Sequence, residues 1–275
     1  MTSPWVERVT ADGSSTLAHG AHGETFHSMS GAWTQARERY ATECRLRERA
    51  LELARSGATT FWLLDIGTGL GLNLAAALEA LDGTGVVLEA TSFERDAELL
   101  AHVVATRREP ADLERWHEPV RTALASALAR RDTEPVPLAN GRLRLVLGDA
   151  RTQLEALHGE VRFDAVFLDP FSPRVEPDLW SRGFLAVVAS RMAPGSRLST
   201  YSAATEVRLG LLDAGLRVGR GARVGEKREG TVASPDLDLP EFDPGTARRL
   251  AARSRADTKE GRFGAQAEDP RGSMP

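Results

Sequence analysis

The alternation of apolar and polar residues divides the chain into short buried strands and amphipathic helices. The apolar residues 61–64 predict a first strand, and the apolar run 72–81 predicts the helix that follows it. Further strands are predicted at residues 86–93, 142–147, 163–168, 197–201, 215–218 and 231–233. Further helices are predicted within residues 31–54 and 96–140, in a stretch ending near Met192, and at residues 207–214. Strands alternating with helices predict an α/β fold with a mostly parallel sheet.

The turn between the first strand and its helix is rich in glycine, since residues 65–73 read DIGTGLGLN. Gly67, Gly69 and Gly71 allow positive φ and a close approach of the backbone to a ligand. Their spacing differs from the G-x-G-x-x-G pattern of dinucleotide-binding turns. An acid placed before the first glycine, Asp65, suits the cationic amino acid end of S-adenosylmethionine (SAM). Asn73, at the end of the turn, is also predicted to bind this cofactor. A purely structural strand-turn-helix is the alternative.

Acidic residues also follow the next two predicted strands. Glu94 lies about 25 residues beyond the glycines, where an acid can accept hydrogen bonds from ribose hydroxyls. A helix N-terminal acid is the alternative interpretation of Glu94. Asp149 is a candidate acceptor for an adenine amino group, and Ala150 would leave room for the ring. Asp149 can equally cap a helix.

A proline-stiffened turn follows the buried strand 163–168. Asp169 would lie in the ligand crevice beyond the carboxyl end of that strand. Asp169-Pro170-Phe171 resembles the tetrad of amino-group methyltransferases, in which a polar side chain holds the acceptor nitrogen and an aromatic ring stacks on the acceptor. Pro170 and Pro173 limit the conformational entropy lost on binding. A structural proline turn is the alternative interpretation.

Composition and charge exclude some other classes of protein. The chain has 275 residues, 41% of them hydrophobic, and a net charge of −4, so no global positive field attracts nucleic acid. Cys44 is the only cysteine, which we expect to be buried and inert. His19 and His22 lack an evident third ligand, so no metal is predicted. No apolar run reaches the length of a membrane span and no signal peptide is recognisable, so we expect a cytoplasmic protein.

The domain organisation follows from changes in composition along the chain. Residues 1–22 are predicted to form a flexible N-terminal arm. Residues 23–233 would form the catalytic domain, beginning with a helical extension. Apolar periodicity fades in the last part of the chain, where Pro, Asp, Gly and Arg dominate, so residues 234–275 are predicted to be a disordered tail.

Five motifs in conserved order make the chain resemble the methyltransferase domain of the MnmC family. They are GTGLGLN at 67–73, SFE at 92–94, LDPFSP at 168–173 with EPDLW at 176–180, GLLDAG at 210–215 and KRE at 227–229. The segment 23–28 is similar to the family's first segment, and the resemblance covers about residues 23–233. Three departures stand out. Pro170 replaces a Gly, Arg223 replaces a Gly, and Glu226 replaces an Arg.

The resemblance implies a class I SAM-dependent methyltransferase with a Rossmann-like, mostly parallel, seven-stranded sheet. It implies N-methylation of 5-aminomethyl(-2-thio)uridine at the wobble position, with the tRNA anticodon region as partner. The family's flavin-dependent oxidase half is absent, so methylation alone is expected. Asp169 and Phe171 would be catalytic. Substrate contacts are expected from Pro170, Pro173, Trp180, Lys227 and Arg228.

Three alternatives stay open. The chain could be a class I methyltransferase acting on a small-molecule or protein amine, and such an enzyme would keep every SAM-binding residue. It could be an aminopropyltransferase-like enzyme, although clustered acids for a polyamine are not evident. It could also be a binding protein that only keeps the fold, which the joint presence of four acids disfavours. These four acids are Asp65, Glu94, Asp149 and Asp169.

Overall fold

The structure is a computed structural model of the whole chain, and it describes residues 5–19, 25–130, 132–157, 161–225 and 229–259. The chain divides into two compact units, Met1–Pro240 and Glu241–Pro275. The first unit holds the sheet and the candidate site. The second contains helix α9 (Pro244–Lys259).

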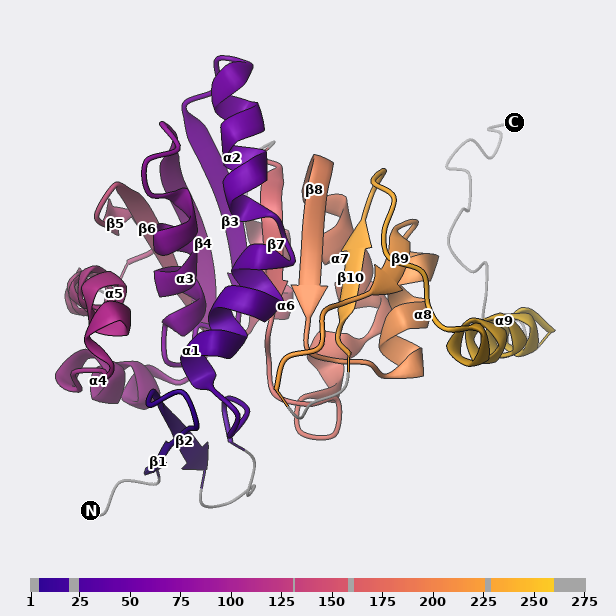
Figure 1. Cartoon of the computed structure of the whole chain (residues 1–275), viewed down its shortest axis with the longest axis horizontal. Helices are drawn as coiled ribbons and strands as arrows, with labels where there is room; N and C mark the ends of the chain where they lie inside the picture. Colours follow the sequence, from indigo (N-terminus) through magenta and orange to yellow (C-terminus); the bar gives the residue numbers. More distant parts are fainter. Residues whose placement is uncertain (1–4, 20–24, 131, 158–160, 226–228, 260–275) are drawn as a thin grey trace, which may run out of the picture. The chain divides into compact units, whose positions relative to one another are not determined.

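The first unit is organised around an eight-stranded sheet (Figure 1). Strands β6, β4, β3, β7 and β8 pair in parallel, while β10 runs antiparallel to both β8 and β9. We predicted seven strands, and the structure adds a two-residue edge strand that pairs antiparallel with β6. In sheet order the strands are β5 (Val136–Pro137), β6 (Gly141–Leu147), β4 (Val87–Glu94), β3 (Thr60–Ile66), β7 (Phe163–Leu168), β8 (Met192–Thr200), β10 (Thr231–Ser234) and β9 (Arg217–Arg220).

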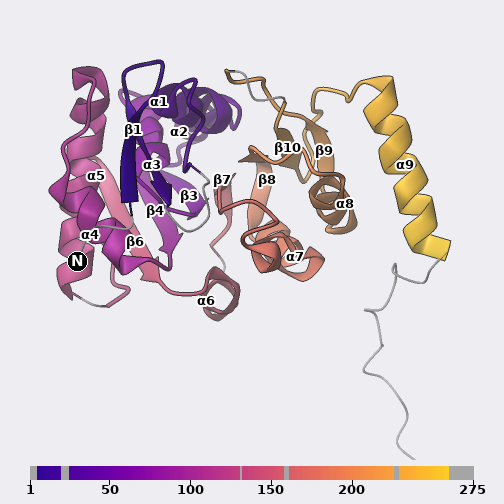
Figure 2. The ribbon, with the colours of Figure 1, turned by 90° about the horizontal axis from the view of Figure 1, so that it is seen from below.

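Helices cover both faces of this sheet, and Figure 2 shows the sheet between the two layers. One layer consists of α1 (Ala32–Gln35), the π-helix η1 (Ala36–Thr42), α2 (Leu46–Arg55), α3 (Leu72–Leu81), α4 (Ala97–Ala105) and α5 (Ala111–Arg130). The other consists of α6 (Ala150–Ala156), the 3₁₀-helix η2 (Pro177–Trp180), α7 (Arg182–Ser190) and α8 (Thr205–Asp213).

The two hydrophobic cores follow from the two-residue period of the central strands. Successive side chains of a strand point to opposite faces. Phe61 and Leu63 therefore enter the core under α1–α5, whereas Leu64 and Ile66 enter the core under α6–α8. A strand that is buried on both faces reads as a continuous apolar run, which explains why the sequence revealed β3 and β7 so clearly.

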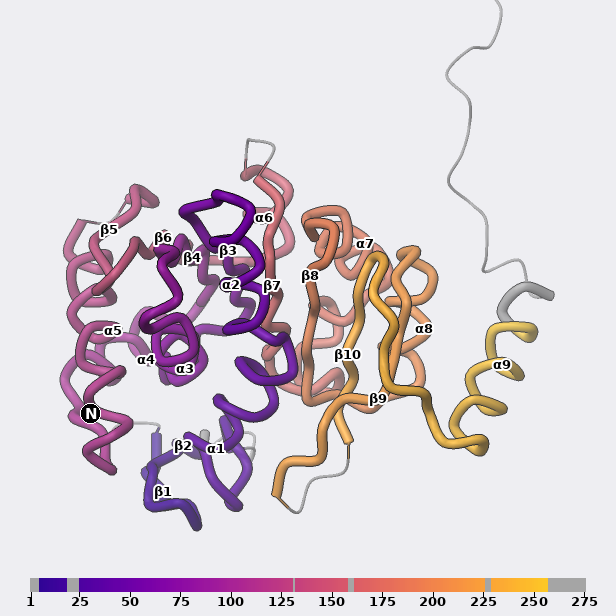
Figure 3. The backbone as a smooth tube through the Cα atoms, turned by 45° about the horizontal axis from the view of Figure 1, so that its top comes forward, coloured from indigo at the N-terminus to yellow at the C-terminus, as the bar shows by residue number. Residues whose placement is uncertain are grey.

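The N-terminal segment forms a hairpin, β1 (Trp5–Val9) with β2 (Ser15–His19), beside α1 (Figure 3). Asp12 and Gly13 make its turn, and the Asp12 carboxylate accepts hydrogen bonds from the Thr34 backbone N–H and hydroxyl, each at 2.8 Å. Burial raises the Asp12 pKa, but hydrogen bonds from Ser14, Thr34 and Thr10 together bring it down to about 2. The predicted flexible arm is therefore wrong for residues 5–19, which are fastened to the first helix.

The second unit corrects the prediction for the tail in part. Asp243 Oδ1 accepts hydrogen bonds from the backbone N–H groups of Gly245 and Thr246, at 2.9 and 3.1 Å, and so caps α9. Pro244 at the first helical position has a φ suited to a helix start. A helix therefore stands where we expected disorder, and residues 260–275 lie outside the described part. No helix among the described residues is both long and apolar enough to cross a membrane.

Candidate functional site

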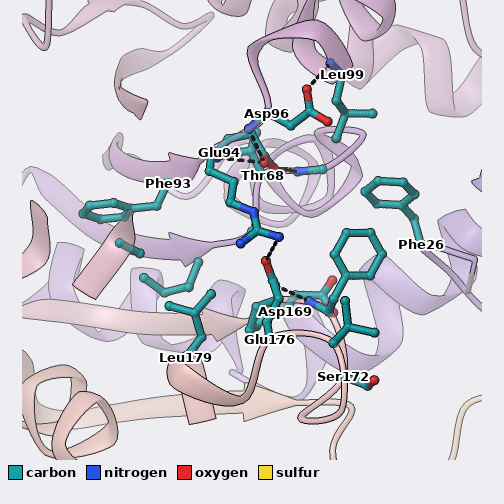
Figure 4. Close-up of a pocket in the computed structure, with 18 of the residues that line it drawn as sticks. Phe26, Thr68, Phe93, Glu94, Asp96, Leu99, Asp169, Ser172, Glu176 and Leu179 are labelled. Atoms are coloured by element: carbon teal, nitrogen blue, oxygen red, sulfur yellow. Dashed lines mark hydrogen bonds and ion pairs between the residues drawn. The ribbon is translucent and has the colours of Figure 1, made fainter. Parts of the chain in front are cut away.

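A pocket lies at the carboxyl ends of the central parallel strands. Strand β3 has β4 on one side and β7 on the other, which is the switch point where open α/β sheets bind ligands. The pocket has a volume of about 660 Å³, within the range of small-molecule sites. Figure 4 shows Glu94 and Asp96 on one side of it, with Asp169 and Glu176 on the other.

Two of the three predicted glycines line this pocket. Gly67 has a φ of 91°, and a Cβ on it would lie 2.6 Å from the Asp169 carbonyl oxygen. Gly69 has a φ of 51°, and its N–H donates to Glu94 Oε2 at 3.0 Å. The glycine turn thus touches both the acid after β4 and the turn after β7. Contact of Gly67 and Gly69 with a cofactor stays a prediction.

Gly71 has a different role from the one we predicted. It lies outside the pocket lining, and a Cβ on it would lie 3.0 Å from Val120 Cγ1 and 3.6 Å from His117 Nε2. The His117 ring donates from Nε2 to the Leu70 carbonyl at 2.7 Å, and burial lowers its pKa to about 4. Gly71 therefore lets α5 pack against the glycine turn.

Asp65 also departs from its predicted role. It is fully buried, does not line the pocket, and accepts a hydrogen bond from Ser92 Oγ at 2.6 Å. It shares a strand face with Leu63, and the β3–β4 register places it directly opposite Ser92. Burial raises its pKa to about 8. The predicted direct contact between the Asp65 carboxyl and the SAM amino group therefore finds no support in this geometry.

Glu94 lines the pocket as predicted, and much of its hydrogen-bonding capacity is already used. Besides Gly69 it accepts from the backbone N–H groups of Arg95 and Asp96, at 2.8 and 3.0 Å. Burial raises its pKa. Asp96, and not Glu94, caps α4 by accepting from Leu99 N–H at 2.9 Å, but Glu94 lies next to the start of this helix, so its interpretation as a helix N-terminal acid stays open. Ribose binding by Glu94 stays a prediction.

Asp149 and Ala150 line the pocket beyond β6. Asp149 caps α6 by accepting from Arg151 N–H at 2.9 Å, and it also binds the Arg151 guanidinium. That pairing lowers the pKa of Asp149. The helix-cap interpretation is confirmed, and adenine recognition by Asp149 and Ala150 stays a prediction.

Asp169 is held at the pocket by an amide from the first turn of α3. Asn73 Nδ2 donates to Asp169 Oδ2 at 2.9 Å, across 96 positions of sequence. Behind this pair lie Arg39 and Tyr40 of the π-helix, both buried and both acting electrostatically on Asp169. Burial first, and then the charge of Asp169, raises the Tyr40 pKa. The sequence contained no signal that Arg39 and Tyr40 support Asp169.

Side chains from other elements hold the backbone of the turn after β7. The Tyr201 hydroxyl donates to the Pro170 carbonyl at 2.9 Å, and Trp180 Nε1 donates to the Phe171 carbonyl at 2.8 Å. Glu176 Oε2 accepts from the Phe171 N–H at 2.9 Å. Trp180 thus contacts the turn from outside the pocket lining.

The other predicted substrate contacts separate into three groups. Pro170 and Phe171 line the pocket, as Asp169 does. Pro173 does not line it, so a direct substrate contact by Pro173 finds no support in this geometry. Lys227 and Arg228 lie outside the described residues.

Four aromatic residues of the pocket lining were not predicted as site residues: Trp5, Phe26, Phe93 and Tyr201. Phe26 lines the pocket, with its ring centroid 4.9 Å from that of Phe171 and 5.3 Å from that of Trp5. Phe26 also lies 3.4 Å from the Cβ position on Gly69. Trp5 belongs to the hairpin β1–β2. The turn pair Asp12-Gly13, flanked by alternating residues, was the sequence signal that residues 5–19 form a hairpin and not a flexible arm.

The chemistry of the lining suits SAM, which carries a sulfonium and an ammonium group. Among the residues that the structure describes, Asn73 Oδ1 is a buried acceptor without a partner, so it could receive an ammonium hydrogen. The lining also carries an excess of acids over bases, which suits a cation: Glu94, Asp96, Asp149, Asp169, Glu176 and Asp178 against Arg95 and Arg151. The described residues contain no cluster of three or more His, Cys, Asp or Glu side chains that could hold a metal ion.

Comparison with known proteins agrees with this assignment. Residues 111–236 match the family described as S-adenosyl-L-methionine-dependent methyltransferase. The crystal structure of MNMC2 from Aquifex aeolicus superposes with a TM-score of 0.75 at 31% identity, covering 91% of this chain and 76% of that one.

Two curated relatives carry the name tRNA 5-methylaminomethyl-2-thiouridine biosynthesis bifunctional protein MnmC. The one from Ralstonia nicotianae is 33% identical over 229 residues, which are 77% of this chain and 32% of the relative. The one from Pseudomonas paraeruginosa is 33% identical over 220 residues, which are 78% of this chain and 33% of the relative. This chain therefore spans about a third of the length of these relatives.

The fold and the site together define a class I SAM-dependent methyltransferase, with SAM as its cofactor. Within that class the chain belongs to the MnmC methyltransferase family, which includes MNMC2 of Aquifex aeolicus.

Proposed function

We propose that this chain methylates the amine of 5-aminomethyl(-2-thio)uridine at the tRNA wobble position, giving the 5-methylaminomethyl product. The reaction would take place in the cytoplasm, on the anticodon region of tRNA. The names of the MnmC relatives support the substrate, and the pairing of Asp169 with Phe171 at one pocket supports the chemistry. The single observation that carries the proposal is the Asn73–Asp169 hydrogen bond beside the Phe171 ring.

The chemistry of an amine acceptor explains the need for Asp169. An alkylamine is mostly protonated near neutral pH and becomes a nucleophile only after it loses a proton. Asn73 donates to Oδ2 of Asp169 and so fixes the carboxylate, and a carboxylate can accept several hydrogen bonds at once, including one from the amine that directs its lone pair. When bound, SAM supplies an electrophilic methyl group. The contribution of the chain is then mainly positioning.

Phe171 provides the flat apolar surface that a nucleobase needs. Single-stranded RNA bases are commonly recognised by stacking on aromatic side chains. Phe171 lines the pocket next to Asp169, so a uracil ring on Phe171 would bring its 5-substituent toward the carboxylate. Phe26 supports the Phe171 ring from the side of the glycine turn.

The test is a methyl-transfer assay with radiolabelled SAM. The acceptor is bulk tRNA from cells that make the aminomethyl intermediate but lack its methylation, and tRNA without the intermediate is the control. We expect labelled methyl at the wobble uridine only in the first sample. If SAM binds by calorimetry but no label appears in tRNA, the tRNA proposal is wrong. Small-molecule and protein amines would then be tested as acceptors with the same enzyme.

A further inference from the structure

Two ion pairs join the two sides of the pocket: Arg151 with Asp178, 2.6 Å apart, and Arg95 with Glu176, which also bonds to the turn that carries Phe171. Arg95, directly after β4, reaches Glu176 in the loop after β7, with Arg95 Nη2 and Glu176 Oε1 2.9 Å apart (Figure 4). The Glu176 side chain is 8% exposed and that of Arg95 is 64% exposed. Both residues line the pocket. Arg95, on the side where the cofactor is expected, thus holds Glu176 in the pocket lining.

The second carboxylate oxygen of Glu176 acts on the acceptor side. Oε2 accepts the hydrogen bond of Phe171 N–H at 2.9 Å. Three other bonds to the backbone of this turn come from neutral groups, namely Tyr201 to Pro170, Trp180 to Phe171, and Asp169 N–H to the Ile66 carbonyl. Among these described contacts Glu176 supplies the one tether that carries a charge.

We propose that Glu176 is a positioning residue of the methyl transfer, which fixes the Phe171 backbone while Arg95 fixes Glu176. The side of the pocket that carries Glu94 is thereby coupled to the turn that carries Asp169 and Phe171. A carboxylate suits this task because each of its oxygens accepts separately, one from the guanidinium and one from the amide.

Four variants separate the two bonds of Glu176. Glu176→Gln and Arg95→Ala each remove the ion pair, and both leave an acceptor at position 176 for Phe171 N–H. Glu176→Ala removes both bonds, and the double variant Arg95→Ala/Glu176→Gln completes a thermodynamic cycle. The matched control is the Arg142–Glu89 pair, which has similar exposure (59% and 12%), a 2.7 Å distance and no place in the pocket lining.

Kinetics with the tRNA acceptor form the first measurement, which rests on the proposed function. We expect kcat to fall about 3- to 10-fold in Arg95→Ala, in Glu176→Gln and in their double variant alike. Glu176→Ala should lose about 10- to 100-fold, since it leaves the Phe171 N–H without its acceptor. The KM for SAM should change little, and Arg142→Ala and Glu89→Gln should keep the wild-type kcat. Effects that multiply in the double variant, or equal losses in the control pair, would overturn the proposal.

Hydrogen–deuterium exchange is the second measurement, and it needs no acceptor. Pro170 and Pro173 carry no amide hydrogen, so Phe171 is one of few exchangeable amides in a peptide across this turn. We expect exchange there to accelerate at least tenfold in Glu176→Ala and to remain slow in Glu176→Gln. If wild-type enzyme fails to methylate tRNA, the proposed function fails, and exchange alone decides on Glu176. Unchanged exchange in Glu176→Ala would refute the positioning role.

Discussion

The two sides of the pocket are built in different ways. The side where we expect the cofactor consists of the glycine turn and the acids that follow β4 and β6, each placed at the end of its own strand. The side where we expect the acceptor is one turn, residues 169–173, held by side chains that come mostly from distant segments of the sequence. Asn73, Tyr201, Glu176 and Phe26 all contribute to it.

The difference shows how much each side depends on tertiary structure. The geometry of a glycine turn at a strand end is a matter of local backbone conformation. Short sequence motifs are enough to determine that conformation. The acceptor turn depends on contacts that exist only once the sheet and the hairpin β1–β2 are in place. We therefore expect substitutions at the acceptor side to reduce turnover more than SAM binding.

The largest effect is expected for Asp169→Ala. Under the proposed function this carboxylate accepts a hydrogen bond from the amine and directs its lone pair, so its loss should lower turnover by about 10²- to 10⁴-fold. SAM affinity, measured by calorimetry, should change little. Asp238→Ala is the control, since it removes a fully exposed acid paired with Arg217 outside the pocket. Wild-type turnover in Asp169→Ala would break the assignment of the acceptor side.

Gly67→Ala tests the point where both sides meet. A Cβ there would lie 2.6 Å from the Asp169 carbonyl oxygen, whereas Gly83, also at positive φ, has nothing within 4 Å of its Cβ position. Gly83→Ala should lower the free energy of unfolding by about 1–2 kcal/mol through backbone strain alone. Gly67→Ala should lower it further and reduce turnover as well. Urea titration of both variants checks this, and equal losses would count against the close approach.

Asp65→Asn tests whether ionisation of the buried Asp65 carboxyl makes the free energy of unfolding depend on pH. The folded-state pKa of Asp65, about 8, exceeds the ordinary value of 3.8. The folded state therefore binds more protons between these values, and unfolding free energy should fall as pH rises through that window, by at most about 1.4 kcal/mol per unit. The variant should weaken this slope and match the wild type most closely near pH 4. Denaturation at pH 5, 7 and 9 measures it, and an unchanged slope would contradict the shift.

Phe26→Ala should have the smallest effect. An offset aromatic pair contributes about 0.5–1.5 kcal/mol beyond its area, so loss of the Phe26 ring should lower turnover roughly 2- to 10-fold. Phe26→Leu retains an apolar contact and should lose less. Both variants should keep the SAM affinity within a few-fold of the wild type. A larger loss of SAM binding than of turnover would place Phe26 on the cofactor side instead.

Much of the fold could be predicted from the sequence. The predicted strand and helix at residues 61–64 and 72–81 correspond to β3 and α3, because the period of apolar residues reports which face is buried. The positions of Asp169, Phe171 and Glu94 at strand ends were also predicted and now line one pocket. The hairpin β1–β2 and helix α9 were missed, because their turn and cap signals are only two residues long.

The sequence by itself determined the order of the elements, the glycine turn and the acids at the strand ends, since each of these depends on residues close together in the chain. Only the tertiary structure decided that Asp65 faces Ser92 beneath the turn, that Gly71 packs against α5, and that Arg95 meets Glu176. These outcomes depend on strand register, on the face to which a side chain points and on which helices pack together. Strand register and helix packing join segments that are distant in the sequence, and they depend on how both hydrophobic cores are buried. No local sequence pattern encodes them.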